Sequence, residues 1–471
     1  MSVPAMSVHR AMADPFAWDE SLLRRYAHGG PCYTSYPTPS AFREDFGEVD
    51  YQAALARSNA GGRPLSVYVH IPFCRHVCHY CALNQVATRA NRLAEPYLSR
   101  LDREMVLIRQ RLDTSREIQQ LHWGGGTPTF LSLDQMSDLI DRLDARFGLS
   151  GSRDRDYAIE IDPREADVLT LRHLQALGFN RLSLGVQDLD PRVLKAVNRI
   201  QPRALTEALI DEADRLGFRS LNLDLIIGLP LQTRDSFAAT LEQVIAMAPA
   251  RLSVYRYAHL PERFAAQRRI RRGELPDPEE KRAILRTAVA MLTEAGYVHI
   301  GMDQFARPDD SLAVAQRQGS LRRSFQGYTS HPDSDLVGLG VSAFSRVDDV
   351  YTQNHTQLGA YEGALDASGL PVFRGRRLTF DDQVRRHAIE RLTCDMALDL
   401  EALGERFGID APRYLADAMP RLEALRRDGL LGWQGNRLEA TPMGQLLIQH
   451  IAMAFDAYRA KEPPPAAKGQ H

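Results

Sequence analysis

Six short runs of β-branched and other apolar residues recur along the middle of this 471-residue chain, and helical patterns separate them. The intervening stretches 92–112 and 235–247 place apolar residues at the spacing of an amphipathic helix. Because strands joined by crossover helices lie parallel, the pattern predicts an α/β fold built on a full or partial parallel (β/α) barrel. The runs cover residues 66–71, 121–125, 157–162, 181–186, 221–228 and 251–258.

Polar side chains stand at or near the carboxyl ends of these runs, the end at which a parallel barrel holds its ligand. A charged group inside an apolar strand is costly unless it is paired, and each of these groups alone could be a satisfied core residue. Their recurrence at similar positions predicts a lined pocket. The residues are Glu160 and Asp162 in the third run, Gln187 and Asp188 after the fourth, and Asp224 in the fifth.

Three of the five cysteines lie in the loop that follows the first run. Cys74, Cys78 and Cys81 have the spacing Cys-x3-Cys-x2-Cys, and Pro72 ends the strand before them. Three thiolates can hold a [4Fe-4S] cluster and leave one iron open to a non-protein ligand. The loop therefore predicts an iron centre at which a further molecule can react.

Two other interpretations of this loop remain open. The first is a structural zinc site with His76 or His79 as a fourth ligand, although closed zinc sites normally join two short motifs. The other cysteines, Cys32 and Cys394, are isolated in the sequence and offer no second motif. The second is a set of inert buried thiols. Three cysteines within eight residues, interleaved with His, Arg and Tyr, favour the cluster.

Composition narrows the class of protein. With 44% hydrophobic residues and a net charge of −2, the chain is typical of a globular protein without a general attraction to nucleic acid or anionic membranes. It contains neither a signal-peptide core in its first 20 residues nor an apolar stretch of about 18 residues that could span a membrane. The odd number of cysteines fits a reducing compartment. We expect a cytoplasmic protein.

The chain divides into four predicted parts. They are an N-terminal arm rich in turn-forming residues at 1–60, the barrel with a substrate-facing extension at 61–375, a mainly helical, winged-helix-like domain at 376–460, and a disordered tail at 461–471. The third part is predicted to contain helices at 381–394, 399–407, 412–428 and 442–458 and a hairpin at 430–433 and 437–441. Its charges are mixed, whereas a nucleic-acid reader shows a basic face.

With Tyr80 before its last cysteine, the loop resembles the signature of radical S-adenosylmethionine (SAM) enzymes. Four motifs resemble those of the oxygen-independent coproporphyrinogen III oxidases (dehydrogenases) of bacterial haem synthesis, and the resemblance extends from about residue 26 to about residue 458. The motifs are Tyr-Val-His-Ile-Pro-Phe-Cys at 68–74, His-Trp-Gly-Gly-Gly-Thr-Pro-Thr at 122–129, Gly-Met-Asp at 301–303 and Phe-Ala-Arg-Pro-Asp-Asp at 305–310.

The resemblance implies a reaction. Cys74, Cys78 and Cys81 would hold the cluster, and an electron given to it would cleave SAM. The 5′-deoxyadenosyl radical would take a β-hydrogen from a propionate of coproporphyrinogen III. Loss of carbon dioxide and one more electron would leave a vinyl group, twice per substrate, giving protoporphyrinogen IX. The resemblance also implies an electron donor of the flavodoxin or ferredoxin kind and a monomeric protein.

The resemblance further implies the residues around SAM. Tyr68 would act in catalysis with its phenol near the sulfonium, Glu160 and Asp224 would accept hydrogen bonds from amino or hydroxyl groups, and Arg199 would pair with the methionine carboxylate. Arg307 and arginines near residues 325–328 are candidates for the propionates. The expected SAM contacts are Tyr68, Tyr80, Gly125, Gly126, Thr127, Glu160, Gln187, Arg199 and Asp224, with further nucleotide or second-ligand contacts at Ala258 and Phe344.

Three positions depart from the family's motifs. The family continues its cluster loop as Cys-x-Cys-Asn, whereas this chain has Leu83 in place of the fourth cysteine; that thiol is not a cluster ligand, so radical formation should survive. Cys32 replaces the usual Arg, and its thiol could reach the site instead; Gln304 replaces the usual His. The departures keep two alternatives open: a radical SAM paralogue that acts on another tetrapyrrole or as a methyltransferase, and a non-enzymatic haem-binding or haem-delivery protein.

Overall fold

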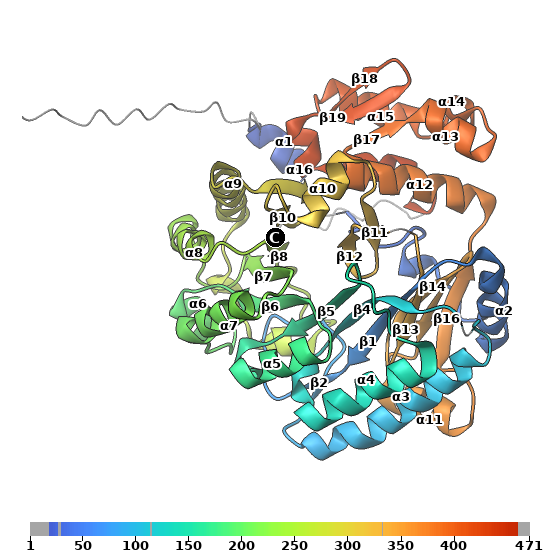
Figure 1. Ribbon diagram of the computed structural model, residues 1–471. Coiled ribbons are helices and arrows are strands. Elements are labelled where there is room, and N and C mark those ends of the chain that lie inside the picture. The colour runs from blue at the N-terminus through green and yellow to red at the C-terminus, as the bar shows by residue number, and fades with distance from the viewer. Residues whose placement is uncertain (1–17, 27–29, 114, 332, 460–471) are drawn as a thin grey trace, which may run out of the picture.

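The centre of the structure is an open sheet whose middle strands are parallel. The computed structural model describes residues 18–26, 30–113, 115–331 and 333–459. The strand order is β16-β15-β14-β13-β1-β4-β5-β6-β7-β8-β10-β9, which begins and ends on different strands, so the predicted barrel is partial (Figure 1). The parallel strands match the predicted runs and are β1 (Leu65–Ile71), β4 (Ile118–Gly125), β5 (Asp156–Ile161), β6 (Arg181–Gln187), β7 (Ser220–Ile227) and β8 (Arg251–Arg256).

Along each of these strands, apolar and polar residues alternate between two faces. In β4, Leu121 and Trp123 pack into the hydrophobic core under the helices, while Gln120 and His122 line the inside of the partial barrel. Trp123 is fully buried, with its ring 5.0 Å from that of Phe179. The outward residues stabilise the sheet, and the inward residues are left free to form a polar lumen.

Helices cover the outer face of the sheet (Figure 1). Local sequence fixes their ends: Ser132 and Gln135 form a reciprocal cap at the start of α4, and Gly217 adopts a left-handed conformation after α7. The covering helices are α3 (Ala94–Arg109), α4 (Leu133–Phe147), α5 (Val168–Ala176), α6 (Pro191–Ala196), α7 (Arg203–Leu216), α8 (Arg234–Ala246), α9 (Pro278–Glu294) and α11 (Leu358–Asp366). The helices expected at 92–112 and 235–247 are thus present.

The sheet extends beyond the six expected strands at both edges. β13 adds to β1 in parallel, and β14, β15 and β16 follow in antiparallel order. At the other edge β10 pairs antiparallel with β8 and β9. The bounds are β9 (Val298–Gly301), β10 (Gln304–Ala306), β13 (Asp335–Leu339), β14 (Phe344–Val347), β15 (Val350–Asn354) and β16 (Val372–Arg377). α10 (Ser311–Arg317) and a hairpin of β11 (Arg322–Ser324) and β12 (Gly327–Thr329) connect the two edges in the chain.

The described part of the arm contains two helices that its turn-rich composition did not predict, α1 (Glu20–Arg25) and α2 (Glu48–Ser58). The segment 33–38 between them is irregular, as expected. Its tyrosines tie the arm to the C-terminal region: the Tyr33 hydroxyl donates to the Asp456 carboxylate at 2.9 Å, and the Tyr36 hydroxyl accepts from the Ala457 N–H at 3.1 Å.

The C-terminal region is mainly helical around a small antiparallel sheet of order β17-β19-β18. The single helix expected at 442–458 is wrong: the chain forms three short turns of helix, because Leu447 leaves helical geometry with φ −111° and ψ 22°. Asp399 caps α13 rather than starting it. The helix expected at 412–428 is two separate helices, α14 and α15, and Pro420 lies in the first turn of the second rather than interrupting one helix. The elements are α12 (Phe380–Asp395), β17 (Ala397–Asp399), α13 (Leu400–Phe407), α14 (Ala411–Tyr414), α15 (Met419–Arg427), β18 (Leu431–Gln434), β19 (Arg437–Ala440), α16 (Pro442–Leu446), α17 (Ile448–Ala452) and the 3₁₀ turn Met453–Phe455.

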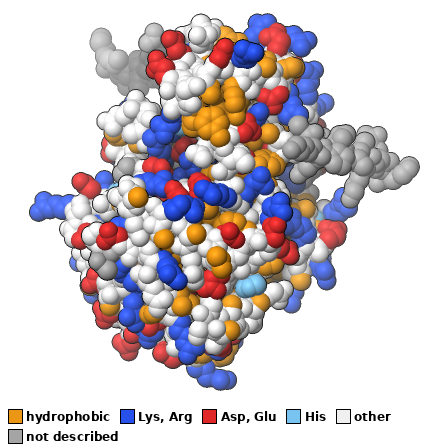
Figure 2. All heavy atoms as spheres, turned by 90° about the vertical axis from the view of Figure 1, so that its right-hand side faces the viewer, with side chains coloured by type: hydrophobic (Ala, Val, Ile, Leu, Met, Phe, Trp, Pro, Cys, Tyr) orange, Lys and Arg blue, Asp and Glu red, His pale blue; other side chains and the backbone are white. Residues whose placement is uncertain are grey.

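On the face shown in Figure 2, basic and acidic side chains are interspersed, in keeping with the net charge of −2. Within the described ranges, every helix is too short or too polar to cross a bilayer. The tail expected to be disordered at 461–471 lies outside the described residues.

Candidate active site

The cysteine loop leaves the sheet at the carboxyl end of β1 and is anchored by a short parallel ribbon, β2 (Phe73–Cys74) and β3 (Val86–Ala87). The Val86 N–H donates to the Pro72 carbonyl at 2.7 Å, and the Thr88 N–H donates to the Cys74 carbonyl at 2.9 Å. Cys74 and Cys78 are buried, whereas Cys81 is partly exposed. The ribbon closes the base of the loop and turns the three thiols toward one region.

Each thiol has a donor or a cation beside it. Thr127 Oγ1 lies 3.4 Å from Cys74 Sγ, and the Leu83 N–H donates to Cys81 Sγ at 3.4 Å. Arg164 and Arg199 reach Cys78 Sγ at 3.3 and 3.5 Å. Hydrogen bonds and positive charge at sulfur favour thiolate over thiol, which is the form that binds iron.

Burial acts in the opposite direction on two of these thiols. It raises the pKa of Cys74 to about 12 and that of Cys81 to about 11. Iron must therefore displace protons when it binds at neutral pH. Within the described residues, no three His, Cys, Asp or Glu side chains are grouped closely enough to hold a single metal ion. A four-iron cluster is larger and spans thiolates that lie farther apart.

A shelf of three glycines ends β4 beside the cysteine loop. A Cβ on Gly124 would lie 2.8 Å from the Glu160 carboxylate, and one on Gly125 would lie 2.9 Å from the Ile71 carbonyl. A Cβ on Gly126 would lie 2.6 Å from the Pro72 carbonyl and 2.9 Å from Cys74 Sγ. The backbone approaches the loop closely because these side chains are absent.

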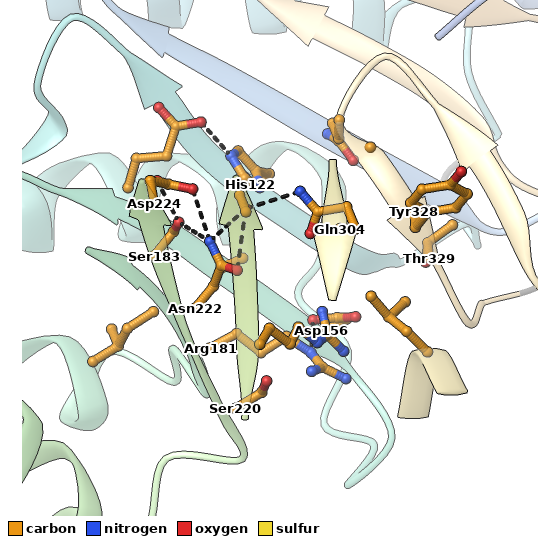
Figure 3. Close-up of a pocket in the computed structure, with 18 of the residues that line it drawn as sticks. His122, Asp156, Arg181, Ser183, Ser220, Asn222, Asp224, Gln304, Tyr328 and Thr329 are labelled. Carbon is orange, nitrogen blue, oxygen red and sulfur yellow. Dashed lines mark hydrogen bonds and ion pairs between the residues drawn. The ribbon is translucent and has the colours of Figure 1, made fainter. Parts of the chain in front are cut away.

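A polar cavity of about 190 Å³ fills the lumen below this shelf (Figure 3). Its walls are the inward residues of successive strands. They include Gln120, His122, Asp156, Glu160, Arg181, Ser183, Ser220, Asn222, Asp224, Arg251, Ser253, Tyr255 and Gln304, with Gln326, Tyr328 and Thr329 from the β11–β12 hairpin. We call this cavity the lumen pocket.

Asp224 lies at the centre of a hydrogen-bond network in the lumen pocket. Asn222 Nδ2 donates to Asp224 Oδ1 at 2.9 Å and Ser183 Oγ donates to Oδ2 at 3.0 Å (Figure 3). Gln304 donates to Ser253, which also bonds Asn222. Burial is the main cause that raises the pKa of Asp224 to about 6, and the negative charge of Glu160 adds to the increase. A hydrogen-bond donor on a ligand would therefore stabilise the ionised form of this carboxylate.

Glu160 and Tyr68 stand above this network, toward the cysteine loop. Glu160 Oε1 lies 3.0 Å from His122 Nε2, and Oε2 accepts from the Gly125 N–H at 3.4 Å. The Tyr68 hydroxyl lies 3.2 Å from His70 Nδ1, and its ring stacks on that of His122 at 5.7 Å. Glu160 keeps 41% of its side chain exposed toward the cavity, so it can still bind a ligand.

Arg199 is buried between the loop and the ends of β5 and β6. Its guanidinium donates to Asp162 at 3.1 Å, to the Tyr80 hydroxyl at 3.3 Å and to the Gly185 carbonyl at 2.6 Å. Although burial opposes ionisation of Asp162, Arg199 and Arg164 lower its pKa to about 2. Asp162 thus holds the two arginines that contact Cys78 and does not line the lumen pocket.

The remaining expected residues are divided between the site and its surroundings. Gln187 is buried at the end of β6 beside Arg199, with a left-handed backbone. Ala258 is exposed after β8. Asp188, expected in the pocket, is instead fully buried and bonds Gln232 at 2.6 Å and Thr240 at 2.7 Å, so it orders a loop. Phe344 does not line the lumen pocket; its ring stacks on Phe325 at 4.7 Å.

The three departures occupy different places. Leu83 is 58% exposed next to Cys81. Gln304 lines the lumen pocket. Cys32 is exposed on the arm, and its carbonyl accepts from Arg323 at 3.0 Å. No contact joins Cys32 to the cysteine loop among the described residues, so the idea that its thiol reaches the cluster has no support here.

Several pocket residues were missed, and one signal could have found them. His122, Ser183, Asn222 and Ser253 each occupy the inward position of a strand, two residues before or after another polar residue. A period of two within the apolar runs marks them as facing a common lumen. Gln304 and the hairpin residues lack such a signal, because they reach the lumen only through tertiary structure.

The comparisons with known proteins agree on one family. The profile of the radical SAM superfamily matches residues 68–244, and that of the HemN C-terminal domain matches residues 378–447. Oxygen-independent coproporphyrinogen III oxidases are similar over nearly the whole chain. The one from Pseudomonas aeruginosa is 49% identical, over 95% of this chain and 97% of its own. The one from Escherichia coli is 47% identical, over 94% and 95%.

A solved structure of coproporphyrinogen III oxidase from Escherichia coli, described as a radical SAM enzyme, superposes with a TM-score of 0.90 at 45% sequence identity. The match covers 94% of this chain and all of the other.

Proposed function

Since the chain belongs to the oxygen-independent coproporphyrinogen III oxidases within the radical SAM superfamily, we propose that the lumen pocket and the cysteine loop together form its active centre. The reaction of the family is the oxidation of two propionates of coproporphyrinogen III to vinyl groups, giving protoporphyrinogen IX in haem biosynthesis. The observation that carries the assignment is the 49% identity over 95% of the chain. The match extends through the C-terminal domain, which a match to the radical SAM region alone would not cover.

The bound cofactors, a [4Fe-4S] cluster and SAM, supply a 5′-deoxyadenosyl radical that can take a hydrogen atom from an unactivated carbon. The protein holds and orients them. Cys74, Cys78 and Cys81 would ligate the cluster. The glycine shelf at Gly125 and Gly126 would present bare backbone to SAM.

The polar residues of the site would then orient the other groups of SAM. Glu160 and Asp224 would accept hydrogen bonds from amino or hydroxyl groups, and Tyr68 would lie near the sulfonium, above the lumen. Arg199 has both terminal nitrogens bonded to protein, while Nε is buried without a partner among the described residues. We therefore propose that Arg199 acts through its positive charge, which lies beside Cys78 and would also lie beside the SAM carboxylate. Tyr80, Thr127, Gln187 and Ala258 would complete the cofactor contacts.

The chain's partners would be coproporphyrinogen III and a one-electron carrier of the flavodoxin or ferredoxin kind. We further propose that the protein acts as a monomer in the cytoplasm. The final electron from each decarboxylated propionate would pass to an acceptor outside this chain.

The function is tested with anaerobically reconstituted protein supplied with reductant, SAM, coproporphyrinogen III and a one-electron acceptor. We expect protoporphyrinogen IX together with two molecules of 5′-deoxyadenosine per molecule of product, because each vinyl group requires one hydrogen abstraction. 5′-Deoxyadenosine without a vinyl product would reassign the chain to another radical SAM substrate. Tight haem binding with neither product would support the haem-delivery alternative.

SAM affinity is expected to fall as the pH drops below about 6, the pKa of Asp224. The neutral carboxyl loses its capacity to accept two hydrogen bonds, so affinity should fall by up to about tenfold per pH unit below that pKa. The Asp224→Asn protein should bind SAM more weakly at pH 8 and show no such dependence. Equilibrium dialysis of the cluster-loaded proteins measures this, with the exposed Asp235→Asn protein as the control. A parent profile that stays flat below pH 6 would contradict the role of Asp224.

A further inference from the structure

We propose that a compartment lined by Arg322, Arg323, Arg346 and Arg386, beside the lumen pocket, binds the propionate carboxylates of the tetrapyrrole that are not reacting. The proposal deepens the proposed function and rests on it. We call this region the arginine compartment.

The arginine compartment consists of two small neighbouring cavities of about 30 and 20 Å³. The arm segment 33–36, the β11–β12 hairpin, β14 and α12 enclose them, and both are lined by Arg323, Ser324, Leu336, Arg346 and Glu390. Ser324, Thr329 and Gln120 line the lumen pocket as well. The hairpin is thus a partition between the compartment and the lumen, and one molecule could extend to both sides of it.

Positive charge exceeds negative charge in the compartment. Four arginines line the two cavities together, against two acidic residues, Asp333 and Glu390. Arg346 pairs with Asp333 and also donates to the Ser334 carbonyl at 2.7 Å. Arg323 stacks on the Tyr328 ring at 4.4 Å and donates to the Cys32 carbonyl. These two arginines therefore have protein partners.

The other two arginines lack such partners. Arg322 and Arg386 are half-buried, and neither side chain has a hydrogen bond or an ion pair within the described residues; Asp395 attracts Arg322 and Asp333 attracts Arg386 only over a longer distance. A guanidinium withdrawn from water without an acceptor is costly, and its planar fork matches a carboxylate. The two cavities, of about 30 and 20 Å³, have room for a carboxylate group, because one water needs about 10–15 Å³ of such space. These two guanidinium groups could therefore each bind a carboxylate of a ligand.

The partition itself offers one more unused donor. Gln326, at the turn of the hairpin, has a buried Nε2 without a partner among the described residues, while its Oε1 accepts from Ser66 at 3.4 Å. Gln326 lines the lumen pocket. An anionic or carbonyl group that crosses from the lumen toward the arginine compartment would pass this amide.

Other arginines near the lumen are already neutralised. Arg181 pairs with Asp156, and Arg251 pairs with Asp310 at 2.9 Å. Arg307 lies at a different cavity with Asp309 and Asp310 and pairs with Asp309 at 3.3 Å, so the earlier expectation that it binds a propionate has no support here. A substrate with four carboxylates that meets a chain of net charge −2 needs local cations, and two arginines of the arginine compartment have no hydrogen bond or ion pair among the described residues.

Binding of coproporphyrin III, the stable fluorescent tetracarboxylate, tests the proposal on the full-length protein reconstituted with its cluster and SAM. We expect the Arg322→Gln and Arg386→Gln proteins to bind it roughly 10- to 100-fold more weakly each. Coproporphyrin tetramethyl ester should bind the parent and both variants equally. The exposed Arg421→Gln protein, with the same loss of charge, should bind coproporphyrin III as the parent does.

Thermal unfolding separates a binding role from a structural one. Because neither guanidinium has a hydrogen bond or an ion pair among the residues that the structure describes, the variants should unfold at the parent's temperature or above it. Equal binding by parent and variants would overturn the compartment while leaving the oxidase function standing. Weaker binding together with a lower unfolding temperature would overturn it as well. A parent that neither binds coproporphyrin III nor forms a vinyl product would overturn both the compartment and the function.

Discussion

The Cys78→Ser protein is expected to contain no [4Fe-4S] cluster and to lose oxidase activity by about 1,000-fold or more, as when an essential member of a catalytic unit is removed. Two thiolates remain, but a cluster held by three cannot spare one. The change has a second effect, since Arg164 and Arg199 both direct a nitrogen at Cys78 Sγ. A serine hydroxyl would leave these cations beside a neutral group.

Iron and sulfide analysis and the electron paramagnetic resonance of the reduced protein measure this loss directly, independently of turnover. The matched control is Cys32→Ser, which removes an exposed thiol outside the loop. That control should retain the iron, the sulfide and the activity of the parent. Full cluster content in the Cys78→Ser protein would show that the loop does not ligate the cluster through these three thiols.

The parallel core was predictable because each strand combines two local signals, an apolar outward face and a short length between helical segments. The edges were not. Asp335 of β13 pairs with Leu65 of β1, far apart in the chain, and short strands such as β10 carry too few residues for a period to show. The expected final helix failed for a related reason. Its composition is helical, but the backbone leaves helical geometry at Leu447, where no proline or glycine marks a break.

The site was predictable to the extent that its chemistry is concentrated in short motifs. The cysteine spacing, the glycine triplet and the strand-end acids Glu160 and Asp224 all point to one region, and the structure gathers them around the lumen. Asp162 and Asp188 have the same sequence signature yet serve other purposes, because an acid's role depends on its neighbours: Arg199 for one, Gln232 and Thr240 for the other. The arginine compartment has no motif, since at least four chain segments assemble it.

The Gly126→Ala protein is expected to lose at least about 100-fold in oxidase activity, the scale of a misplacement of about 1 Å among reacting groups. The added Cβ would lie 2.6 Å from the Pro72 carbonyl oxygen and 2.9 Å from Cys74 Sγ. The first contact is with backbone, which cannot rotate away, and the Gly126 N–H is held by the Ile71 carbonyl at 2.8 Å. The strand end and the cysteine loop must therefore separate, which moves one cluster ligand relative to the other two.

Overpacking of this kind also costs about 1–3 kcal/mol of stability, so the free energy of unfolding should be measured beside cluster content and activity. Gly151→Ala is the matched control, because its Cβ would meet no atom within 4 Å. We expect that control to match the parent in all three measurements. The decisive comparison is at a temperature where the Gly126→Ala protein is still folded. Normal iron content with normal activity there would mean that the shelf and the loop can separate without harm, and that close backbone approach is not what this site requires.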